Sequence, residues 1–439
     1  MKRWIIEGGV PLKGEITVSG AKNVAFKLMI AALLGQGETI LENVPRVGDV
    51  HLAVEMIRYL GGEVVWLGED TLAIYPDKVD GCTLPVELAR QSRASFMFVG
   101  PLLNRCEEVF LPLPGGDRIG RRPLDRHIAG LKALGAEVVQ QDHGILVRGK
   151  LRGTRFIFPK NTHTGTETLI LAAVNASGET ILENAAQEPE VDDMISFMQK
   201  LGARVQRMAP RTIIIQGGQS LRGVRHRIMN DRNEAVSFAC MALATKGDVH
   251  IRGINKTHIQ AFLALLPKIK AGFSLNSEDL HIWFSQELQT IQVQTSPHPG
   301  IMSDWQPLLT TLMTQAHGIS EIHETVFENR FAYVEALKKM GARIELFNPP
   351  VSDPHQFYNF NWEDNQPHYY HAVRISGPCK LHGIPMQVTD VRAGATLVQA
   401  ALTASGVSQM SGIEHIERGY VNLDERLRAL GAQIQIAEL

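Results

Sequence analysis

A glycine- and proline-rich stretch, residues 113–123 (LPGGDRIGRRP), gathers one carboxylate and three guanidinium groups. The acid is Asp117, and the cations are Arg118, Arg121 and Arg122. No regular helix or strand tolerates so much glycine and proline, so the stretch predicts a mobile surface loop. Such a loop suits a lid that closes over an anionic substrate, because excluding water strengthens the charge interactions inside. A solvated turn with a surface charge cluster is the alternative, which the stretch taken alone favours.

Further basic residues stand where apolar helices are expected to begin. Lys22 and Asn23 follow a glycine turn at such a point, where backbone N–H groups and the helix dipole also favour an anion. Comparable places are occupied by Arg93, Arg232, Arg392 and Arg418. Each of these residues alone is best explained as a solvated charge at a helix end. Together they predict an anion-binding cleft, because equivalent positions of a repeat lie on one face of each domain.

Two acidic residues have both a chemical and a structural interpretation. Asp304 follows a proline-rich turn and precedes an expected helix, so it could cap that helix or act as a base. Glu328 belongs to the polar triplet Glu-Asn-Arg at 328–330, between two phenylalanines. The structural explanation of the triplet is a turn held by an ion pair.

A short phrase of the type Leu-Gly-Ala-Glu-Val recurs six times, at 60–64, 134–138, 201–205, 271–275, 340–344 and 430–434. Each copy follows an amphipathic stretch, so a helix is expected to end at the glycine, in a left-handed cap, with a strand after it. In the fourth copy this alignment places Ala271-Gly272 on the Leu-Gly of the others.

A second phrase, with polar and apolar residues alternating, predicts a half-buried strand at 37–43, 178–184 and 247–253. Helices apolar on almost every face, expected in a domain interior, are predicted at 26–34, 167–175, 235–244 and 393–404. The unit of helix, strand, helix, strand, strand therefore occurs six times, which suggests an α/β protein of two domains with three units each. The aromatic-rich segment 347–370 is expected to be a surface insertion without a role in chemistry.

The composition narrows the class of protein. Among 439 residues the net charge is −2, so no basic excess suggests nucleic acid as a partner. Four widely spaced cysteines without a Cys-x-x-Cys pair predict reduced, mostly buried thiols in a cytosolic protein. The N-terminus does not resemble a signal peptide, and apolar runs such as 28–34 are too short to span a membrane. The sixteen histidines do not recur at metal-ligand spacing, so no metal is expected.

The chain resembles the enolpyruvyl transferase family over almost its whole length. The resemblance rests on motifs in the family's order at 19–23, 93–95, 114–123, 183–190, 231–234, 327–331, 389–393 and 418–420. It is strongest to the branch that acts on UDP-N-acetylglucosamine in the first committed step of peptidoglycan synthesis. The implied fold is a two-domain inside-out α/β barrel with six βαβαββ repeats, three per domain. One domain would comprise 1–20 and 231–439, and the other, 21–230, would carry loop 113–123.

The resemblance also implies roles for individual residues. Phosphoenolpyruvate would be bound by Lys22, Arg93, Arg122, Arg392 and Arg418. UDP-N-acetylglucosamine would be bound by Asn23, Arg93, Thr164, Gly165, Asp304, Glu328 and Arg330. Asp304 would be the base and Asp117 the general acid, with Lys22 as the third catalytic residue. No metal or organic cofactor is required, and a cytoplasmic monomer without membrane insertion is expected.

Two departures from the family pattern qualify these roles. Most members carry cysteine in place of Asp117, and fosfomycin alkylates that cysteine. Asp117 can donate a proton if its pKa is raised, and as a poor nucleophile it implies insensitivity to fosfomycin. The segment 162–166 (THTGT) replaces the family's Ser-Val-Gly-Ala-Thr, so another acceptor, such as a nucleoside monophosphate, stays open. A non-catalytic sugar-nucleotide sensor is a third possibility, which the retained Lys22, Asp304 and Arg392 argue against.

Overall fold

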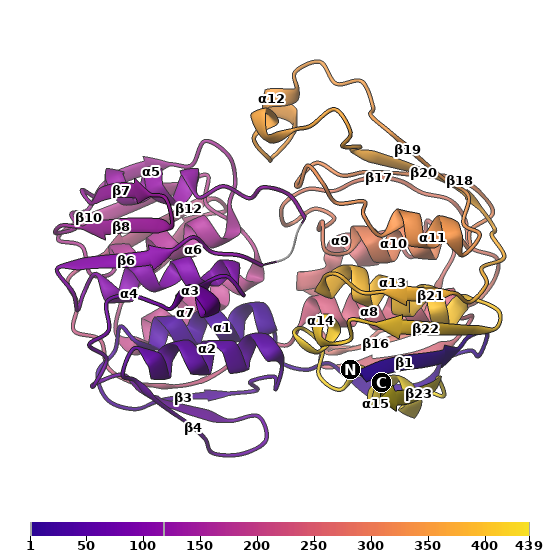
Figure 1. The fold of residues 1–439 in the computed structure, drawn as a ribbon, viewed down its shortest axis with the longest axis horizontal. Coiled ribbons are helices and arrows are strands. Elements are labelled where there is room, and N and C mark those ends of the chain that lie inside the picture. Colours follow the sequence, from indigo (N-terminus) through magenta and orange to yellow (C-terminus); the bar gives the residue numbers. More distant parts are fainter. Residues whose placement is uncertain (1, 117–118, 439) are drawn as a thin grey trace. The chain divides into compact units, whose positions relative to one another are not determined.

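The computed structural model describes residues 2–116 and 119–438, which form two compact units (Figure 1). Within the described chain, unit 1 contains residues 2–19, 119–122 and 230–438. Unit 2 contains residues 20–116 and 123–229. The chain therefore starts in unit 1, builds unit 2 and returns, and the four residues 119–122 are grouped with unit 1.

Unit 1 has three four-stranded sheets around buried helices. The first sheet has the strand order β21 (Pro385–Gln387), β22 (Val407–Ser411), β1 (Lys2–Glu7) and β23 (Gln433–Glu438). The second has the order β15 (Gly272–Leu275), β16 (Asp279–Trp283), β14 (Asp248–Arg252) and β2 (Lys13–Thr17). The third has the order β17 (Gln292–Gln294), β18 (Gly318–His323), β20 (Ala372–Gly377) and β19 (Ile344–Phe347). The inner helices, which contact one another, are α8 (Arg232–Ala244), α10 (Gln306–Met313) and α13 (Val391–Thr403).

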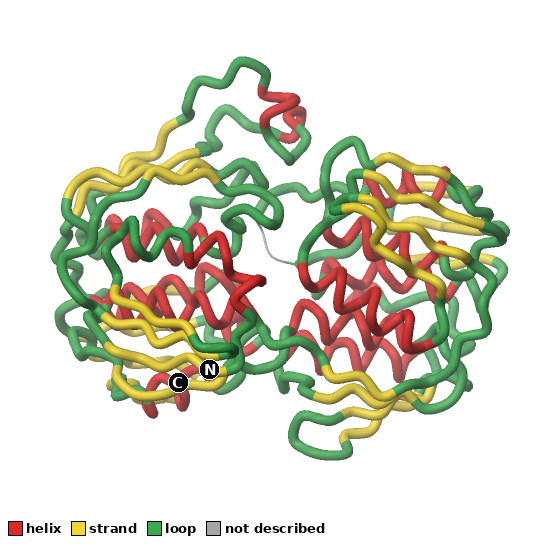
Figure 2. The backbone as a smooth tube through the Cα atoms, turned by 180° about the vertical axis from the view of Figure 1, so that it is seen from behind, coloured by secondary structure: helices red, strands yellow, loops and turns green. Residues whose placement is uncertain are grey.

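Unit 2 follows the same plan. One four-stranded sheet has the order β11 (Arg204–Ala209), β12 (Thr212–Gln216), β10 (Glu179–Glu183) and β9 (Arg155–Ile157). A second four-stranded sheet has the order β13 (Arg225–Arg227), β3 (Thr39–Glu42), β5 (Leu72–Tyr75) and β4 (Glu63–Trp66). The third sheet is three-stranded, in the order β6 (Glu108–Pro112), β8 (Gly144–Arg148) and β7 (Glu137–Gln141). The inner helices are α1 (Lys22–Ala32), α6 (His163–Ala173) and the 3₁₀ helix η1 (Arg93–Phe98), which continues into α4 (Val99–Leu102). Figure 2 shows helices inside and strands outside in each unit.

The inner helices are rich in apolar residues and are buried. All residues of α8 are buried, and in α13 every residue except the last is buried. The sheets cover them with alternating side chains, as in β14, where Val249 and Ile251 are buried while their neighbours are exposed. The predicted interior helices and half-buried strands are thus confirmed.

The six repeats are present, and two of them are modified. In the β21-β22-β1-β23 sheet, β1 comes from the N-terminal end of the chain and pairs with both β22 and β23. It thus completes a repeat whose other strands come from the C-terminal end of the chain. In the three-stranded sheet, a single parallel bridge between Thr83 and Phe110 stands in for the fourth strand. The predicted fold class, an inside-out α/β barrel of βαβαββ units, is confirmed.

The outer helices end as expected in five of the six repeats. These helices are α2 (Gly48–Tyr59), α5 (Asp125–Ala133), α7 (Pro189–Leu201), α11 (Val334–Lys339) and α15 (Leu423–Ala429). The glycine of the recurring phrase has a positive φ after each of them, as at Gly202, where φ is 106°. Glycine is suited to this conformation because it has no Cβ to clash.

The fourth repeat differs from the prediction. The positive φ lies at Lys270, with a value of 57°, two residues before Gly272. Ala271 N donates to Leu266 O at 3.0 Å, the same five-residue closure seen after the other outer helices. The alignment of Ala271-Gly272 with Leu-Gly is therefore wrong by two residues. Gly272 instead lies in β15, where a Cβ would collide with the indole of Trp283.

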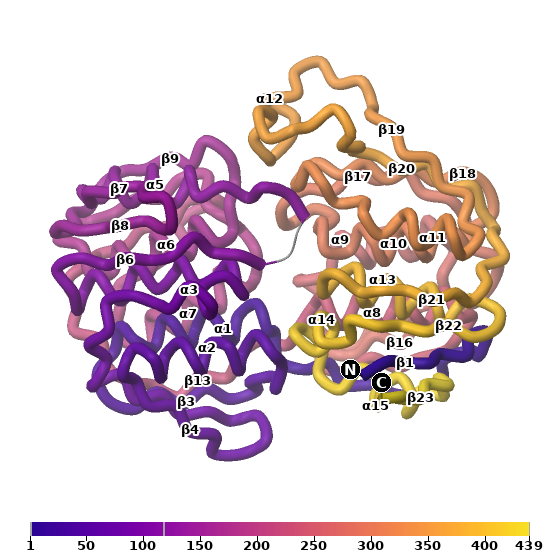
Figure 3. The backbone as a smooth tube through the Cα atoms, in the orientation of Figure 1, coloured from indigo at the N-terminus to yellow at the C-terminus, as the bar shows by residue number. Residues whose placement is uncertain are grey.

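Segment 347–370 of unit 1 connects β19 to β20 and contains α12 (Pro354–Phe357) and the 3₁₀ helix η3 (Trp362–Asp364) (Figure 3). It forms a small aromatic core of its own. Tyr358, which is 1% exposed, stacks on Phe360 and on Trp362 with ring centroids 4.8 and 5.3 Å apart. Burial in this cluster lowers the pKa of His371 to about 4. The segment is thus an ordered addition to the repeat.

The prediction of four reduced cysteines is wrong for two of them. Cys82 and Cys106 form a disulfide, with Cα atoms 5.9 Å apart. The bridge between Thr83 and Phe110 brings these two segments together, which sequence spacing alone does not reveal. Cys240 and Cys379 are free and buried, as predicted. Among the helices of the described residues, none combines the length and the apolar character needed to cross a membrane.

Candidate functional site

Unit 2 presents candidate residues where its inner helices begin. Lys22 is the first residue of α1, is 8% exposed, and donates from Nζ to Asp49 Oδ2 at 2.7 Å. Asn23 follows it and is half-buried. Arg93 is the first residue of η1, whose N-cap is Ser92. Helix N-termini favour anions, so these side chains lie where an anionic substrate would be attracted.

The third inner helix, α6, begins in the segment that departs from the family pattern. Thr162 caps it by accepting a hydrogen bond from Gly165 N at 3.2 Å. A Cβ at Gly165 would lie 2.4 Å from the Thr162 side chain, so a larger residue here would require that side chain to move. Thr164 Oγ1 lies 3.1 Å from His127 Nε2. Threonine and glycine thus build a capped turn at the start of α6.

A buried ionic triad, which the sequence reasoning missed, lies behind this turn. Lys27 Nζ is 2.6 Å from Glu167 Oε2 and 3.1 Å from His163 Nε2, and Glu167 is fully buried. Burial raises the pKa of Glu167, but the charges of His163 and Lys27 outweigh burial and lower it overall. Burial lowers the pKa of His163, but Glu167 outweighs burial and raises it overall. The available signal was a single lysine in the predicted apolar helix 26–34 and a single glutamate at the start of the predicted apolar helix 167–175.

In unit 1, Asp304 lies between two arginines. Arg392 Nε donates to Asp304 Oδ2 at 3.2 Å, and Arg330 Nη2 donates to Asp304 Oδ1 at 3.4 Å. Asp304 does not cap α10, because the N-cap position is Trp305 and no side chain bonds there. The capping alternative is therefore wrong, and the carboxylate is oriented by the two guanidinium groups instead.

Arg392 is the best-anchored cation of this group. Asp390 caps α13 and accepts hydrogen bonds from Arg392 N at 3.0 Å and Ala393 N at 2.9 Å, which fixes the start of the helix. Arg392 Nη1 donates to the hydroxyl of Tyr420 at 3.0 Å. Burial lowers the pKa of Arg392, but Tyr420 and Asp304 outweigh burial and raise it, so this residue stays charged.

Two donors of the arginine pair remain available to a ligand. Arg392 Nη2 and Arg330 Nε are buried and have no hydrogen-bond partner in the part of the chain that the structure describes. Both arginines are at most 5% exposed. Because buried polar groups are normally hydrogen-bonded, these donors are suited to an incoming anion.

Glu328 contacts the C-terminal part of the glycine-rich loop. It is 2% exposed, and its carboxylate accepts a hydrogen bond from Arg121 N. Burial raises the pKa of Glu328. Gly120 has a φ of 146° and no space for a Cβ, because the Glu328 carboxylate lies against it. Arg122 lies over the ring of Phe327, 5.8 Å from its centroid.

The remaining candidates are Arg418 and Asp117. Arg418 is half-buried directly after the short helix α14 (Glu414–Glu417). Asp117, the expected general acid, lies outside the described residues, as does Arg118. In unit 1 the structure therefore brings Asp304, Arg330 and Arg392 together. Tyr420, which had no assigned role, joins them; its place directly after the Arg-Gly of 418–419 was the only signal.

The family profile described as EPSP synthase (3-phosphoshikimate 1-carboxyvinyltransferase) matches residues 6–427 of this chain. A UDP-N-acetylglucosamine 1-carboxyvinyltransferase of Caldanaerobacter subterraneus subsp. tengcongensis is 37% identical over 99% of both chains. One of Legionella pneumophila is 37% identical over the whole of this chain and 83% of its own.

Solved structures agree on the fold. The enolpyruvyl transferase NikO from Streptomyces tendae has a TM-score of 0.86 at 23% identity, covering 99% of both chains. An EPSP synthase from Acinetobacter baumannii has a TM-score of 0.71 at 18% identity, covering both chains fully. At these identities the likeness concerns the fold.

Proposed function

The chain belongs to the EPSP synthase family of enolpyruvyl transferases, and from this we propose that it transfers the enolpyruvyl group of phosphoenolpyruvate to the 3-hydroxyl of UDP-N-acetylglucosamine, releasing phosphate. The observation that best supports this proposal is the 37% identity, across nearly the whole chain, to relatives named for this reaction. The product would enter peptidoglycan synthesis. The proposal includes the cytoplasmic location and monomeric state expected from the sequence.

The arginine pair of unit 1 supports binding of the anionic substrate. Phosphoenolpyruvate carries a carboxylate and a phosphate, and Arg392 Nη2 and Arg330 Nε are buried donors without partners among the described residues. In the proposal, Lys22, Arg93, Arg122 and Arg418 supply further positive charge. Charges held in place before the reaction stabilise the developing negative charge, usually the largest single contribution to catalysis.

The proton transfers are assigned to two aspartates. Asp304 takes the proton from the 3-hydroxyl, and the guanidinium groups of Arg392 and Arg330 hold its carboxylate in place. Asp117 gives a proton to the methylene carbon of phosphoenolpyruvate, which makes the adjacent carbon electrophilic. The sugar oxygen adds there, giving a tetrahedral intermediate that still carries the phosphate. Loss of phosphate and of one methyl proton restores the double bond.

The sugar nucleotide is assigned to Asn23, Arg93, Thr164, Gly165, Asp304, Glu328 and Arg330. Among these, Glu328 already accepts a hydrogen bond from Arg121 N, so a sugar hydroxyl would share or replace that contact. A nucleoside monophosphate acceptor is not favoured, because the relatives that match at 37% identity are named for UDP-N-acetylglucosamine.

Phosphate release from phosphoenolpyruvate tests the proposal directly. Release is expected with UDP-N-acetylglucosamine and not with UMP or without an acceptor. The product should carry the carboxyvinyl group on the 3-oxygen, which mass spectrometry and NMR can identify. Release with UMP alone would assign the other acceptor, and ligand binding without release would indicate a sensor.

A further inference from the structure

The outward face of the β15-β16-β14-β2 sheet carries a cluster unrelated to the candidate site. Two histidines lie directly opposite each other, since His250 of β14 pairs in register with His281 of β16 on an antiparallel strand. Asp248 lies two residues before His250 and therefore on the same face. Val249 and Ile251, the residues on either side of His250, are buried and point to the other face.

These three side chains converge. One ligand atom from each of Asp248, His250 and His281 lies within 4.8 Å of the other two. The imidazole rings stack with centroids 3.8 Å apart and an interplanar angle of 7°. His281 Nε2 lies 2.6 Å from Asp248 Oδ1, a hydrogen bond that orients the ring. The three donors therefore lie close enough together to hold one ion.

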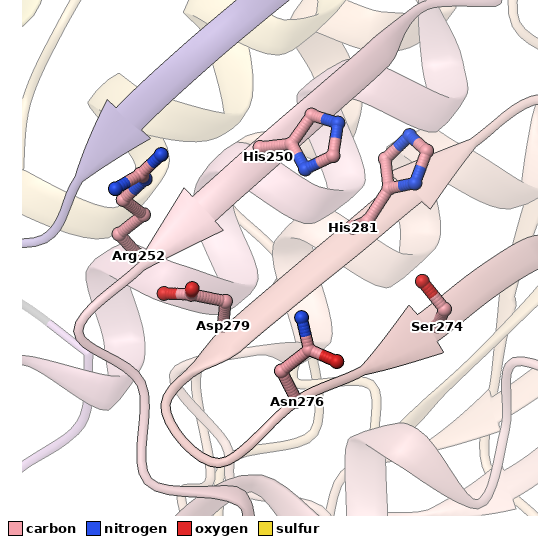
Figure 4. A pocket seen from close by; sticks show the side chains of 6 residues that line it. All are labelled: His250, Arg252, Ser274, Asn276, Asp279 and His281. Atoms are coloured by element: carbon pink, nitrogen blue, oxygen red, sulfur yellow. The ribbon is translucent and has the colours of Figure 1, made fainter.

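A depression of about 200 Å³ adjoins the histidines (Figure 4). It is lined by His250, Arg252, Ser274, Asn276, Asp279 and His281. In Figure 4 the two imidazoles lie side by side on neighbouring strands, with Ser274 on the strand beyond and Asn276 directly after it. The depression leaves room for water or another small ligand at a fourth coordination position.

The neighbouring charges do not oppose a cation. Arg252, the nearest cation on β14, pairs with Glu15 at 2.5 Å and is offset by it. Asp279 lies opposite Arg252 in the register. On β2, Lys13 lies beside Asp248 in the register. Around the cluster, the carboxylates of Asp248, Glu15 and Asp279 outnumber the two cations, Lys13 and Arg252, and this charge balance favours a bound cation.

We propose that Asp248, His250 and His281 form a binding site for a divalent transition-metal ion of the zinc class. Two imidazoles and one carboxylate are a ligand set of catalytic zinc sites, which keep a further position open for water. Imidazole nitrogen selects zinc, nickel and copper over magnesium and calcium, which prefer oxygen. The bound ion would join β14 to β16, in addition to the proposed transferase activity and independently of it.

Calorimetric titration of untagged protein with Zn²⁺ tests the site. One ion per chain is expected, with no binding of Mg²⁺. Cu²⁺ is expected to quench tryptophan fluorescence, because the Trp283 ring lies 4.5 Å from the His281 ring. In Trp283→Phe this quenching should be lost while Zn²⁺ still binds.

His250→Gln and His281→Gln should each weaken Zn²⁺ binding at least about tenfold, because even the loss of a second-shell partner costs ~10–100-fold in metal affinity. Both side chains lie on a surface strand face, so the metal-free melting temperature should change little, and transferase activity should be unchanged. The matched control is His317→Gln, which removes an exposed histidine paired with Glu287 at 3.4 Å. Absence of saturable binding by the wild type, or binding that survives both His250→Gln and His281→Gln, would overturn the proposal.

Discussion

Arg121 of the glycine-rich loop donates from Nη1 to Asp364 Oδ1 at 2.7 Å, and so connects that loop to segment 347–370. The arginine side chain is 74% exposed, whereas that of Asp364 is 6% exposed. The backbone N of the same arginine donates to Glu328. Two carboxylates therefore hold the end of the loop, and one of them comes from the segment expected to have no role in chemistry.

Asp364→Asn tests whether this contact matters for turnover. An ion pair with an exposed partner contributes only ~0–1 kcal/mol, so the melting temperature should change little. If loss of the ion pair raises the activation free energy by up to ~1 kcal/mol, turnover should fall by up to about fivefold. The turnover number and the KM for phosphoenolpyruvate, both from phosphate release, are the measurements.

Glu363→Gln is the matched control for Asp364→Asn. It removes the adjacent carboxylate, which is 71% exposed and pairs with His355 at 3.2 Å rather than with the loop. Turnover unchanged in both variants would show that segment 347–370 does not act through Arg121.

Asp304→Asn should separate binding from chemistry. Loss of the base should lower the turnover number by about 10²–10⁴-fold. Removing a carboxylate that competes for Arg392 and Arg330 should leave phosphoenolpyruvate binding equal or tighter. Turnover and equilibrium binding, measured on the same preparation, give the two quantities.

An equal loss of affinity and turnover in Asp304→Asn would mean that Asp304 mainly positions the arginines. Asp353→Asn is a suitable control, since that half-buried aspartate caps the surface helix α12, far along the chain from Asp304. It should leave both quantities unchanged.

The triad behind α6 predicts a pH dependence of stability. Because the pKa of His163 is raised in the folded protein, protonated His163 stabilises the fold fully below about pH 6.5. This stabilisation is lost as the pH rises through the folded-state pKa. Because the pKa of Glu167 is lowered in the folded protein, ionised Glu167 stabilises the fold fully above about pH 4.5. This stabilisation is lost as the pH falls through the folded-state pKa. The melting temperature should therefore decline above pH 6.5, and less steeply in His163→Gln.

Glu167→Gln should destabilise unit 2 by about 3–5 kcal/mol, because it leaves the Lys27 ammonium buried without its counter-charge. Replacing both residues by apolar ones of similar size should recover most of that loss. His355→Gln, on the surface, is the control for the pH profile. A wild-type profile that is flat above pH 6.5 would contradict the ionised triad.

The repeats were predictable because each one carries its own signals: an apolar helix, an alternating strand and a glycine at the helix end. The register of the fourth copy was not, because Lys270 holds the positive φ that glycine holds elsewhere. Contacts between distant segments leave no local pattern. The Cys82–Cys106 bridge, the Lys27–Glu167 pair and the placing of Asp304 between Arg330 and Arg392 all depend on how the repeats assemble.

Asp117, whose role follows from the family resemblance alone, can be tested through fosfomycin. The proposed transferase should keep its full activity after incubation with the epoxide, because a carboxylate is a poor nucleophile towards it. Asp117→Cys should gain time-dependent inactivation and a covalent adduct detectable by mass spectrometry, since a thiolate attacks the epoxide readily. The buried Cys240 is an internal control, because burial raises the pKa of its thiol and it should remain unmodified. Wild-type activity that fosfomycin abolishes would mean that another nucleophile of this chain reacts, and that the role given to Asp117 is wrong.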